Sequence, residues 1–325
     1  MIELDSRISH ADIAAFATEK VNLKREDVKE HREQVGRLRD RLESYIQAHP
    51  HFDLVKMLNS GSVAKGTALK TINDIDVAVY VKSNKAPAES QLIAWLTERL
   101  REAYGDLMSA DQFVPQHHCV QVKFRGSGLD VDVVPVLYEG GADDRGYLIT
   151  KDTGARVLTS IPLHLAFTRK RKNAHKTHYR QLVRLVKWWK RVQAAQREEF
   201  RFKSFMIELL LAHLFDTGLD GADYGRGLFE FFAYIRRTGL KERISFTDYY
   251  ATSEIGSSSE AIQIYDPVNP KNNVASLYTD SDRLALVEAA EDAADAIAFA
   301  RRATTKGAAA TQWQMILGSS FQAAS

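Results

Sequence analysis

Two pairs of aspartates alternate with apolar residues in this 325-residue chain. Asp74 and Asp76 lie in the run DIDVAVYV, and Asp130 and Asp132 lie in the run LDVDVVPV. Because successive side chains of a strand point to opposite faces, each pair lies on one face, with its Cα atoms about 7 Å apart. Carboxylates on one face repel each other unless a cation lies between them, and oxygen ligands of this type suit Mg²⁺.

If the two strands are neighbours, three carboxylates can hold two metal ions. Such a pair of ions stabilises both the attacking and the leaving oxygen of an in-line phosphoryl transfer. We expect Asp74, Asp76 and Asp132 to be the ligands of two Mg²⁺ ions, with Mn²⁺ as a substitute. Asp130 lies two residues further back and is either a neighbour of the site or the alternative third ligand. For the first pair alone, a solvent-facing edge strand is the competing interpretation.

A glycine and a serine, Gly61 and Ser62, precede the first aspartate pair. Glycine permits a close approach of the backbone to a phosphate, and backbone N–H groups together with a serine hydroxyl can hold its oxygens. A P-loop is excluded, because that motif needs a lysine after its second glycine, where this chain has Thr67 after Gly66. The pair therefore predicts a triphosphate contact of another kind.

The residues around these motifs predict a mixed sheet flanked by helices. Helical periodicity covers about 11–49, with one apolar stripe that consists of Val35, Leu38, Leu42, Tyr45 and Ile46. A further helix is expected over 89–105. The expected strands are 54–60, 74–81, 117–124 and 129–138.

From Pro162 onward the composition becomes helical. The expected helices cover 163–195, 200–215, 227–239 and 281–303. Between them, IYDPVNPKNNVA at 264–275 is expected to be a loop, because its prolines and asparagines oppose regular structure. The fold class is therefore α+β, with a sheet lobe that includes the N-terminal helices over 1–160 and a mostly helical lobe over 161–325.

The composition, 45% hydrophobic and 26% charged, is that of an ordinary globular protein. The single cysteine, Cys119, excludes an internal disulfide, and the N-terminus lacks the apolar region of a signal peptide. The most apolar helical stretch, 205–215, is too short to cross a membrane. We therefore expect a cytoplasmic protein with no membrane partner.

A net charge of +2 conceals an uneven distribution. The stretch 164–203 is rich in Lys and Arg and contains only two acidic residues, Glu198 and Glu199. Such a stretch predicts an attraction for phosphate, and a solvated helix face is the competing interpretation.

The order Gly-Ser, spacer 63–73 and Asp-x-Asp resembles the nucleotidyltransferase motif of the DNA polymerase β superfamily. More closely, this segment, LDVDVVPV, LVRLVKWWK, FKSFMIELL and YDPVNPKNNVA resemble the 2′-5′ oligoadenylate synthetases and the bacterial cyclic GMP-AMP synthase-like enzymes. The chain is most similar to the cyclic oligonucleotide synthases of CBASS anti-phage operons, in the clade that works with a HORMA-domain partner. Fainter similarity extends to WQMILGSSF near the C-terminus.

This resemblance implies a polymerase β-type sheet lobe, a helical lobe and an active site in the cleft between them. It makes Asp74, Asp76 and Asp132 the catalytic metal ligands. The residues that it implies in nucleotide binding are Gly61, Ser62, Lys187 and Ser204. A solvated lysine remains the alternative for Lys187, and a simple helix-start serine remains the alternative for Ser204.

The implied activity is the synthesis of a cyclic oligonucleotide second messenger, cyclic tri-AMP from ATP, although other NTPs fit the same motifs. The implied partners are a HORMA-domain regulatory protein and, in the activated complex, double-stranded DNA. Ring closure follows from the resemblance and from no single residue. The alternatives are a linear oligoadenylate synthetase, a tRNA CCA-adding enzyme, and a catalytically silent module that binds nucleotide or RNA.

Overall fold

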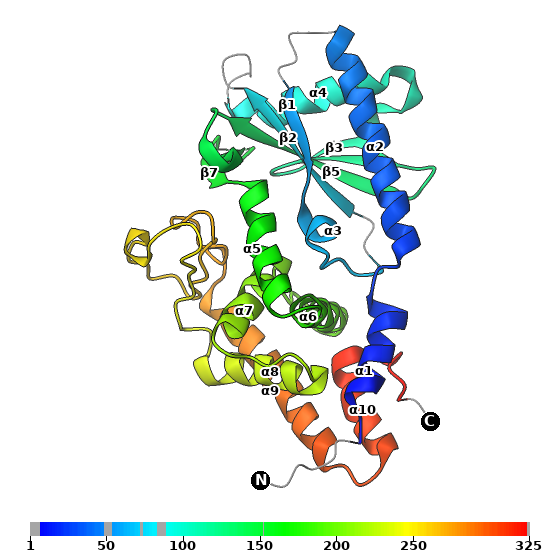
Figure 1. The fold of residues 1–325 in the computed structure, drawn as a ribbon, viewed down its shortest axis with the longest axis vertical. Helices are drawn as coiled ribbons and strands as arrows, with labels where there is room; N and C mark the ends of the chain where they lie inside the picture. The colour runs from blue at the N-terminus through cyan, green and yellow to red at the C-terminus, as the bar shows by residue number, and fades with distance from the viewer. Residues whose placement is uncertain (1–6, 49–53, 72–73, 83–88, 152, 324–325) are drawn as a thin grey trace. The chain divides into compact units, whose positions relative to one another are not determined.

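The computed structural model describes residues 7–48, 54–71, 74–82, 89–151 and 153–323 (Figure 1). The chain divides into two compact units. One unit is Leu23–Thr168, and the other joins Arg169–Ser325 to the N-terminal residues up to Asn22. The first unit contains the sheet and the second is mostly helical, as the α+β class predicts.

The sheet of the first unit is mixed, as expected. Its central strands are ordered β1-β2-β5-β4-β3, and β6 and β7 extend it from β5. The strands β2 and β5 are parallel, whereas the other described pairings are antiparallel. The strands are β1 (Leu54–Asn59), β2 (Asp74–Lys82), β3 (Phe113–Pro115), β4 (Val120–Phe124), β5 (Leu129–Tyr138), β6 (Gly146–Ile149) and β7 (Arg156–Thr159). The sequence did not predict β3, β6 or β7.

One face of this sheet is covered by helices α2 (Arg25–Ala48) and α4 (Leu92–Tyr104) (Figure 1). The predicted apolar stripe of α2 is confirmed at four positions, Val35, Leu38, Leu42 and Tyr45, all of which are buried. The side chain of Ile46 lies outside the described residues. Strand residues whose side chains point to the covered face lie in the core. The residues between them point to the opposite face, where the candidate site lies.

The second unit contains most of the helices. They are α1 (His10–Phe16), α6 (His178–Gln196), α7 (Ser204–Asp216), α8 (Tyr224–Thr238), α9 (Asp280–Arg302) and α10 (Lys306–Leu317), and α5 (Ile161–Ala174) begins in the first unit and ends in the second. The single helix predicted over 163–195 is wrong, because it breaks between α5 and α6, where Lys176 adopts a φ of 52°. No described helix combines the length and the apolarity that a membrane span needs.

The N-terminal helices are divided between the two units, which differs from the predicted domain 1–160. Helix α2 belongs to the sheet unit, but α1 belongs to the helical unit. The reason is aromatic packing: the ring of Phe16 lies 5.8 Å from that of Trp188 and 5.4 Å from that of Phe321. Periodicity shows that a helix has an apolar face, but it does not show which partner covers that face.

Candidate active site

The two aspartate pairs lie on neighbouring strands in register. In the parallel pairing of β2 with β5, Asp74 lies opposite Asp130 and Asp76 lies opposite Asp132. Neighbouring strands are about 4.8 Å apart, so the side chains of Asp76 and Asp132 project side by side from one face. The intervening Ile75 is buried in the core on the other face. The predicted adjacency of the two strands is therefore confirmed.

The cross-strand neighbours on β4 distinguish the two candidate third ligands. Lys123 lies opposite Asp130, whereas the neutral Gln121 lies opposite Asp132. Each of the two faces a further aspartate across β2, Asp74 for Asp130 and Asp76 for Asp132, so the difference lies on β4, where a cation offsets the charge of Asp130. This difference supports Asp132 as the ligand, and the choice between the two stays a prediction.

The predicted cluster of three carboxylates includes Asp74, whose side chain is not among those that the structure describes. Among the side chains that are described, no group of three or more His, Cys, Asp or Glu is arranged to hold a metal ion. Asp76 and Asp132, two of the three predicted ligands, lie opposite each other, the backbone of Asp74 lies opposite Asp130, and the ligand roles of Asp76 and Asp132 stay predictions. The role of Asp74 stays a prediction.

The backbone of Gly61 lies directly against Asp76. Gly61 begins the short helix α3 (Gly61–Lys65) with a φ of 64°, a conformation that glycine adopts without strain. A Cβ atom at this position would lie only 1.6 Å from Oδ2 of Asp76. The N–H of Ser60 donates a hydrogen bond of 2.9 Å to the backbone carbonyl of Asp76. Only glycine therefore lets the Gly-Ser segment approach the aspartate this closely.

The hydroxyl oxygen of Ser62 is buried and has no hydrogen-bond partner among the described residues. Leaving a buried polar group unsatisfied costs about 1–3 kcal/mol. A ligand oxygen at this position would satisfy the hydroxyl, and a triphosphate oxygen is such an acceptor. The arrangement fits the predicted triphosphate contact, which stays a prediction for both Gly61 and Ser62.

The lysine predicted to bind phosphate is engaged within the protein. Nζ of Lys187, on α6, lies 2.6 Å from Oε1 of Glu208, on α7, and only 6% of each side chain is exposed. The alternative of a solvated lysine is therefore wrong. A phosphate contact by Lys187 stays a prediction, and such a contact would compete with Glu208 for the ammonium group.

Ser204 is the first residue of α7, as the helix-start alternative predicts. Its hydroxyl also accepts a hydrogen bond of 3.3 Å from Nζ of Lys190. Burial and, to a smaller extent, the nearby charge of Lys187 lower the pKa of Lys190. The sequence interpretation did not single out Lys190 or Glu208. The spacing of three residues between Lys187 and Lys190, which places both on one helix face, is the signal that could have found Lys190.

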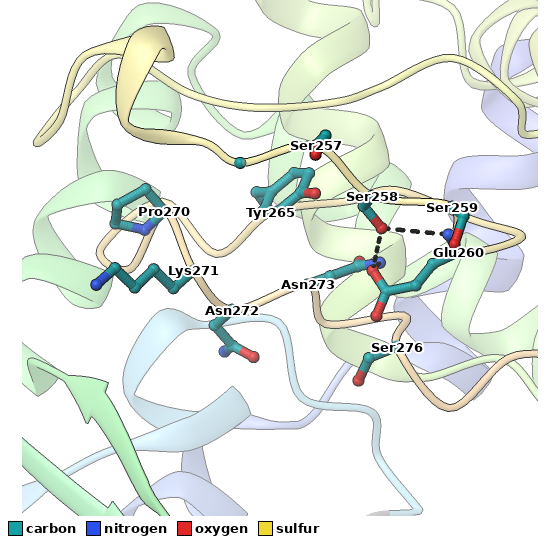
Figure 2. Close-up of a pocket in the computed structure, with 11 residues that line it drawn as sticks. Ser257, Ser258, Ser259, Glu260, Tyr265, Pro270, Lys271, Asn272, Asn273 and Ser276 are labelled. Atoms are coloured by element: carbon teal, nitrogen blue, oxygen red, sulfur yellow. Dashed lines mark hydrogen bonds between the residues drawn. The ribbon is translucent and has the colours of Figure 1, made fainter.

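The segment predicted to be a loop at 264–275 has no helix or regular strand and is held by its own polar side chains. Oδ1 of Asn273 accepts from the backbone N–H of Ile264 at 3.0 Å, and its Nδ2 donates to Oε2 of Glu260 at 2.6 Å. These contacts form one wall of a polar pocket of about 520 Å³ (Figure 2). The pocket is lined by 256–260, Tyr265, 270–273 and Ser276. The sequence interpretation missed this pocket.

Comparisons with known proteins identify the family. Residues 9–162 match the family model described as Second Messenger Oligonucleotide or Dinucleotide Synthetase domain. Over 316 residues the chain is 52% identical to the cyclic AMP-AMP-AMP synthase of Escherichia coli (strain MS 115-1), covering 97% of this chain and 98% of that protein. The chain belongs to the bacterial cyclic GMP-AMP synthase-like nucleotidyltransferases.

Solved structures of this nucleotidyltransferase family agree with the assignment. The structure of E. coli MS115-1 CdnC in a complex with HORMA-deltaN has a TM-score of 0.90 at 51% identity and covers 97% of this chain and 99% of that chain. The Vibrio cholerae DncV structure in its 3′-deoxy GTP bound form has a TM-score of 0.69 at 12% identity, covers 97% of this chain and 96% of that chain, and shows the fold alone. The predicted family, fold class and enzyme class are thereby confirmed.

Within each unit of this nucleotidyltransferase, the structure brings the predicted residues together. In the sheet unit, Gly61 lies against Asp76, and Asp76 lies opposite Asp132. In the helical unit, Lys187 and Ser204 lie on the adjacent helices α6 and α7. The sequence interpretation missed the partners of Lys187 and Ser204, Glu208 and Lys190, and the binding roles of these residues stay predictions.

Proposed function

We propose that this chain makes cyclic tri-AMP from ATP as the second messenger of a CBASS anti-phage system. The observation that carries the proposal is the register of β2 with β5, which sets Asp76 beside Asp132 while the Gly61 backbone lies against Asp76. The 52% identical E. coli relative is named a cyclic AMP-AMP-AMP synthase, which supports the choice of product.

The residues of the sheet unit fit a divalent metal site. Carboxylates from two neighbouring strands, on one face of the sheet, form a set of oxygen donors, and such sets suit Mg²⁺. We expect Asp74, Asp76 and Asp132 to hold two Mg²⁺ ions, with Mn²⁺ as a substitute. When bound, these ions would supply positive charge that stabilises the attacking and leaving oxygens.

The protein's own groups bind and orient the nucleotides. The N–H groups of the Gly61–Ser62 segment and the Ser62 hydroxyl donate to the triphosphate of the donor ATP. A ribose hydroxyl of the acceptor attacks the α-phosphorus in line. A new oxygen–phosphorus bond forms while the bond to the β-phosphate breaks, and pyrophosphate leaves. A carboxylate oxygen of Asp132 accepts the hydroxyl proton as a general base. Repetition on a retained intermediate, followed by ring closure, gives the cyclic product.

In this proposal, a partner protein controls the activity of the enzyme. The related E. coli CdnC has been solved with HORMA-deltaN and, separately, with ATP. We expect a HORMA-domain protein to bind this chain and raise its activity in the cytoplasm. Double-stranded DNA would then contact the basic stretch 164–203 through its phosphates.

The test uses the purified full chain with ATP and Mg²⁺, followed by phosphatase treatment and chromatography of the products. A cyclic product survives phosphatase, because it has no terminal phosphate, whereas a linear product loses its terminal phosphates. We expect a phosphatase-resistant cyclic trimer whose rate of formation rises when a HORMA-domain protein is added. Phosphatase-sensitive ladders as the only product would support a linear oligoadenylate synthetase and contradict the proposal. The absence of any pyrophosphate release would support a catalytically silent module.

A further inference from the structure

The polar pocket of Figure 2 belongs to the helical unit, because all its lining residues fall between Gly256 and Ser276. Its volume of about 520 Å³ is within the range of about 300–1,000 Å³ that is usual for small-molecule sites. Among the described residues, those that line it include none of the residues predicted to bind metal or nucleotide. The pocket is therefore a candidate second site, which the proposed mechanism does not use.

A carboxylate in this pocket is held through one of its two oxygens. Oε2 of Glu260 accepts hydrogen bonds from Oγ of Ser258 at 2.8 Å and from Nδ2 of Asn273 at 2.6 Å. Asn273 is itself buried, and its Nδ2 also donates to the backbone carbonyl of Ile262 at 2.7 Å. Oε1 of Glu260 has no hydrogen-bond donor among the described residues. The fold thus orients this carboxylate and leaves one oxygen able to accept from a ligand.

The side-chain amide of Asn272 is held in the same way. Its Nδ2 donates to Oδ2 of the buried Asp266 at 3.2 Å, and its backbone carbonyl accepts from the N–H of Asp266 at 2.9 Å. Within the described part of the chain, nothing donates to Oδ1 of Asn272. The pocket therefore presents two oriented acceptor oxygens, and a ligand that fits them must bring donors such as hydroxyl groups.

An ammonium lies at the other end of the pocket. Figure 2 shows Lys271 and Glu260 at opposite ends, with Tyr265 and Asn272 between them. The backbone N–H of Lys271 donates to Oδ1 of Asn269 at 3.0 Å, and its ammonium forms no ion pair with any described residue. Further hydroxyls without a described partner line the pocket, those of Ser257, Ser259 and Ser276. An ammonium accompanied by hydroxyls suits a phosphate group.

We propose that this pocket binds a phosphorylated ribose, with its phosphate at Lys271 and its sugar hydroxyls at Glu260 and Asn272. A carboxylate is a common acceptor for a ribose hydroxyl in nucleotide sites. Because the cation and the oriented carboxylate lie at opposite ends, the ligand has one favourable orientation. A nucleotide and a free sugar phosphate share this chemistry. The inference does not rest on the proposed function, since it concerns none of the residues assigned to catalysis.

The experiment measures ligand binding to the full chain by titration calorimetry in EDTA, so that binding through a metal does not contribute. The ligands are AMP, 2′-deoxy-AMP, ribose 5-phosphate and adenosine. We expect adenosine, which lacks the phosphate, to bind at least about tenfold more weakly than AMP, and 2′-deoxy-AMP to bind more weakly by about threefold or more. Affinity for ribose 5-phosphate close to that for AMP would identify a sugar phosphate as a sufficient ligand, whereas binding of AMP alone would identify a nucleotide.

Two variants test the two ends of the pocket. Lys271→Met should weaken AMP binding by at least about tenfold and leave adenosine binding unchanged. Glu260→Gln should reduce the difference between AMP and 2′-deoxy-AMP, because a neutral amide accepts a hydrogen bond less strongly than a carboxylate. The matched control is Lys241→Met, at another exposed lysine of the helical unit, which should bind as the wild type does. Thermal unfolding without ligand should give Lys271→Met and Lys241→Met the Tm of the wild type.

Four outcomes would overturn the assignment. They are no binding of AMP by the wild type, unchanged AMP affinity in Lys271→Met, an equal loss of affinity in Lys241→Met, or a loss of AMP binding in Asp76→Asn, which would assign AMP to the predicted catalytic carboxylates. Failure of the proposed function has a different signature, since the wild type would then make no cyclic product from ATP and Mg²⁺. AMP binding that depends on Lys271 and not on Asp76 would still support the pocket in that case.

Discussion

Replacing Gly61 by alanine tests whether the contact between the Gly-Ser segment and Asp76 is needed for catalysis. The new Cβ atom would lie 1.6 Å from Oδ2, 2.3 Å from Cγ and 2.7 Å from Cβ of Asp76. Carbon and oxygen atoms need more than about 3 Å, so the carboxylate or the segment must move by roughly 1.5–2 Å. Because Ser60 is hydrogen-bonded to the backbone of Asp76, we expect the side-chain carboxylate rather than the segment to move.

The expected loss of activity exceeds the expected loss of stability. A non-glycine residue at a φ of 64° costs about 1–2 kcal/mol, and the forced movement adds a similar amount. A displacement of about 1 Å in a catalytic group lowers a rate by about 100-fold. We therefore expect Gly61→Ala to lower the rate of product formation by at least about 100-fold while the protein stays folded.

The matched control is Gly128→Ala, because Gly128 has a similar φ of 68° but nothing within 4 Å of the position of a new Cβ atom. Both variants carry the same backbone strain, and only the first meets Asp76. Thermal unfolding and chromatography of cyclic product from ATP and Mg²⁺ should show a fall in Tm for both variants, larger for Gly61→Ala, and a large fall in rate for Gly61→Ala alone. Equal activity of the two variants would refute the role of this contact.

Three further predictions address the carboxylates, the buried pair and control. Asp76→Asn and Asp132→Asn should each abolish pyrophosphate release without lowering Tm, because one of two neighbouring like charges is removed; near-normal release from either variant would contradict the metal site. Lys187→Met should lower the free energy of unfolding in urea by about 3–5 kcal/mol, and a change below about 1 kcal/mol would show that the pair with Glu208 is not structural. Any stimulation by double-stranded DNA in the presence of a HORMA-domain protein should fall steeply between about 50 and 200 mM salt, whereas a salt-independent effect would exclude phosphate contacts by the stretch 164–203.

The strands β2 and β5 and their carboxylates were predictable because their signals are local. Alternation of aspartate with aliphatic residues fixes which face each side chain occupies, and a side-chain period of two makes any error of register costly. The pairing of Asp76 with Asp132 follows once the two strands are neighbours. The Gly-Ser signal is also local, since close approach to Asp76 requires the absence of a side chain at Gly61.

The features that escaped prediction depend on distant residues. Whether Lys187 faces water or a carboxylate depends on Glu208, which lies on another helix in a strongly apolar run. The placement of α1 depends on aromatic rings near both ends of the chain, those of Phe16 and Phe321. The break before α6 occurs at Lys176, a residue type that gives no turn signal. The first two are decided by tertiary contacts that no local pattern contains.

Polar residues that stabilise the fold have their charges and hydrogen bonds satisfied within the protein, whereas those available to a ligand have not. Arg171, only 3% exposed, is paired with Asp216 and Asp248, so its burial is satisfied within the protein. The buried hydroxyl of Ser62 lacks a partner among the described residues, and half-buried Lys190 lacks a carboxylate there. The hydroxyl donor lies in the sheet unit and the ammonium donor lies in the helical unit. Because each is left uncompensated, each lowers the stability of its own unit. A phosphate oxygen is the kind of acceptor that each donor lacks within its own unit, and incomplete compensation is the pattern that we expect of residues that bind a nucleotide.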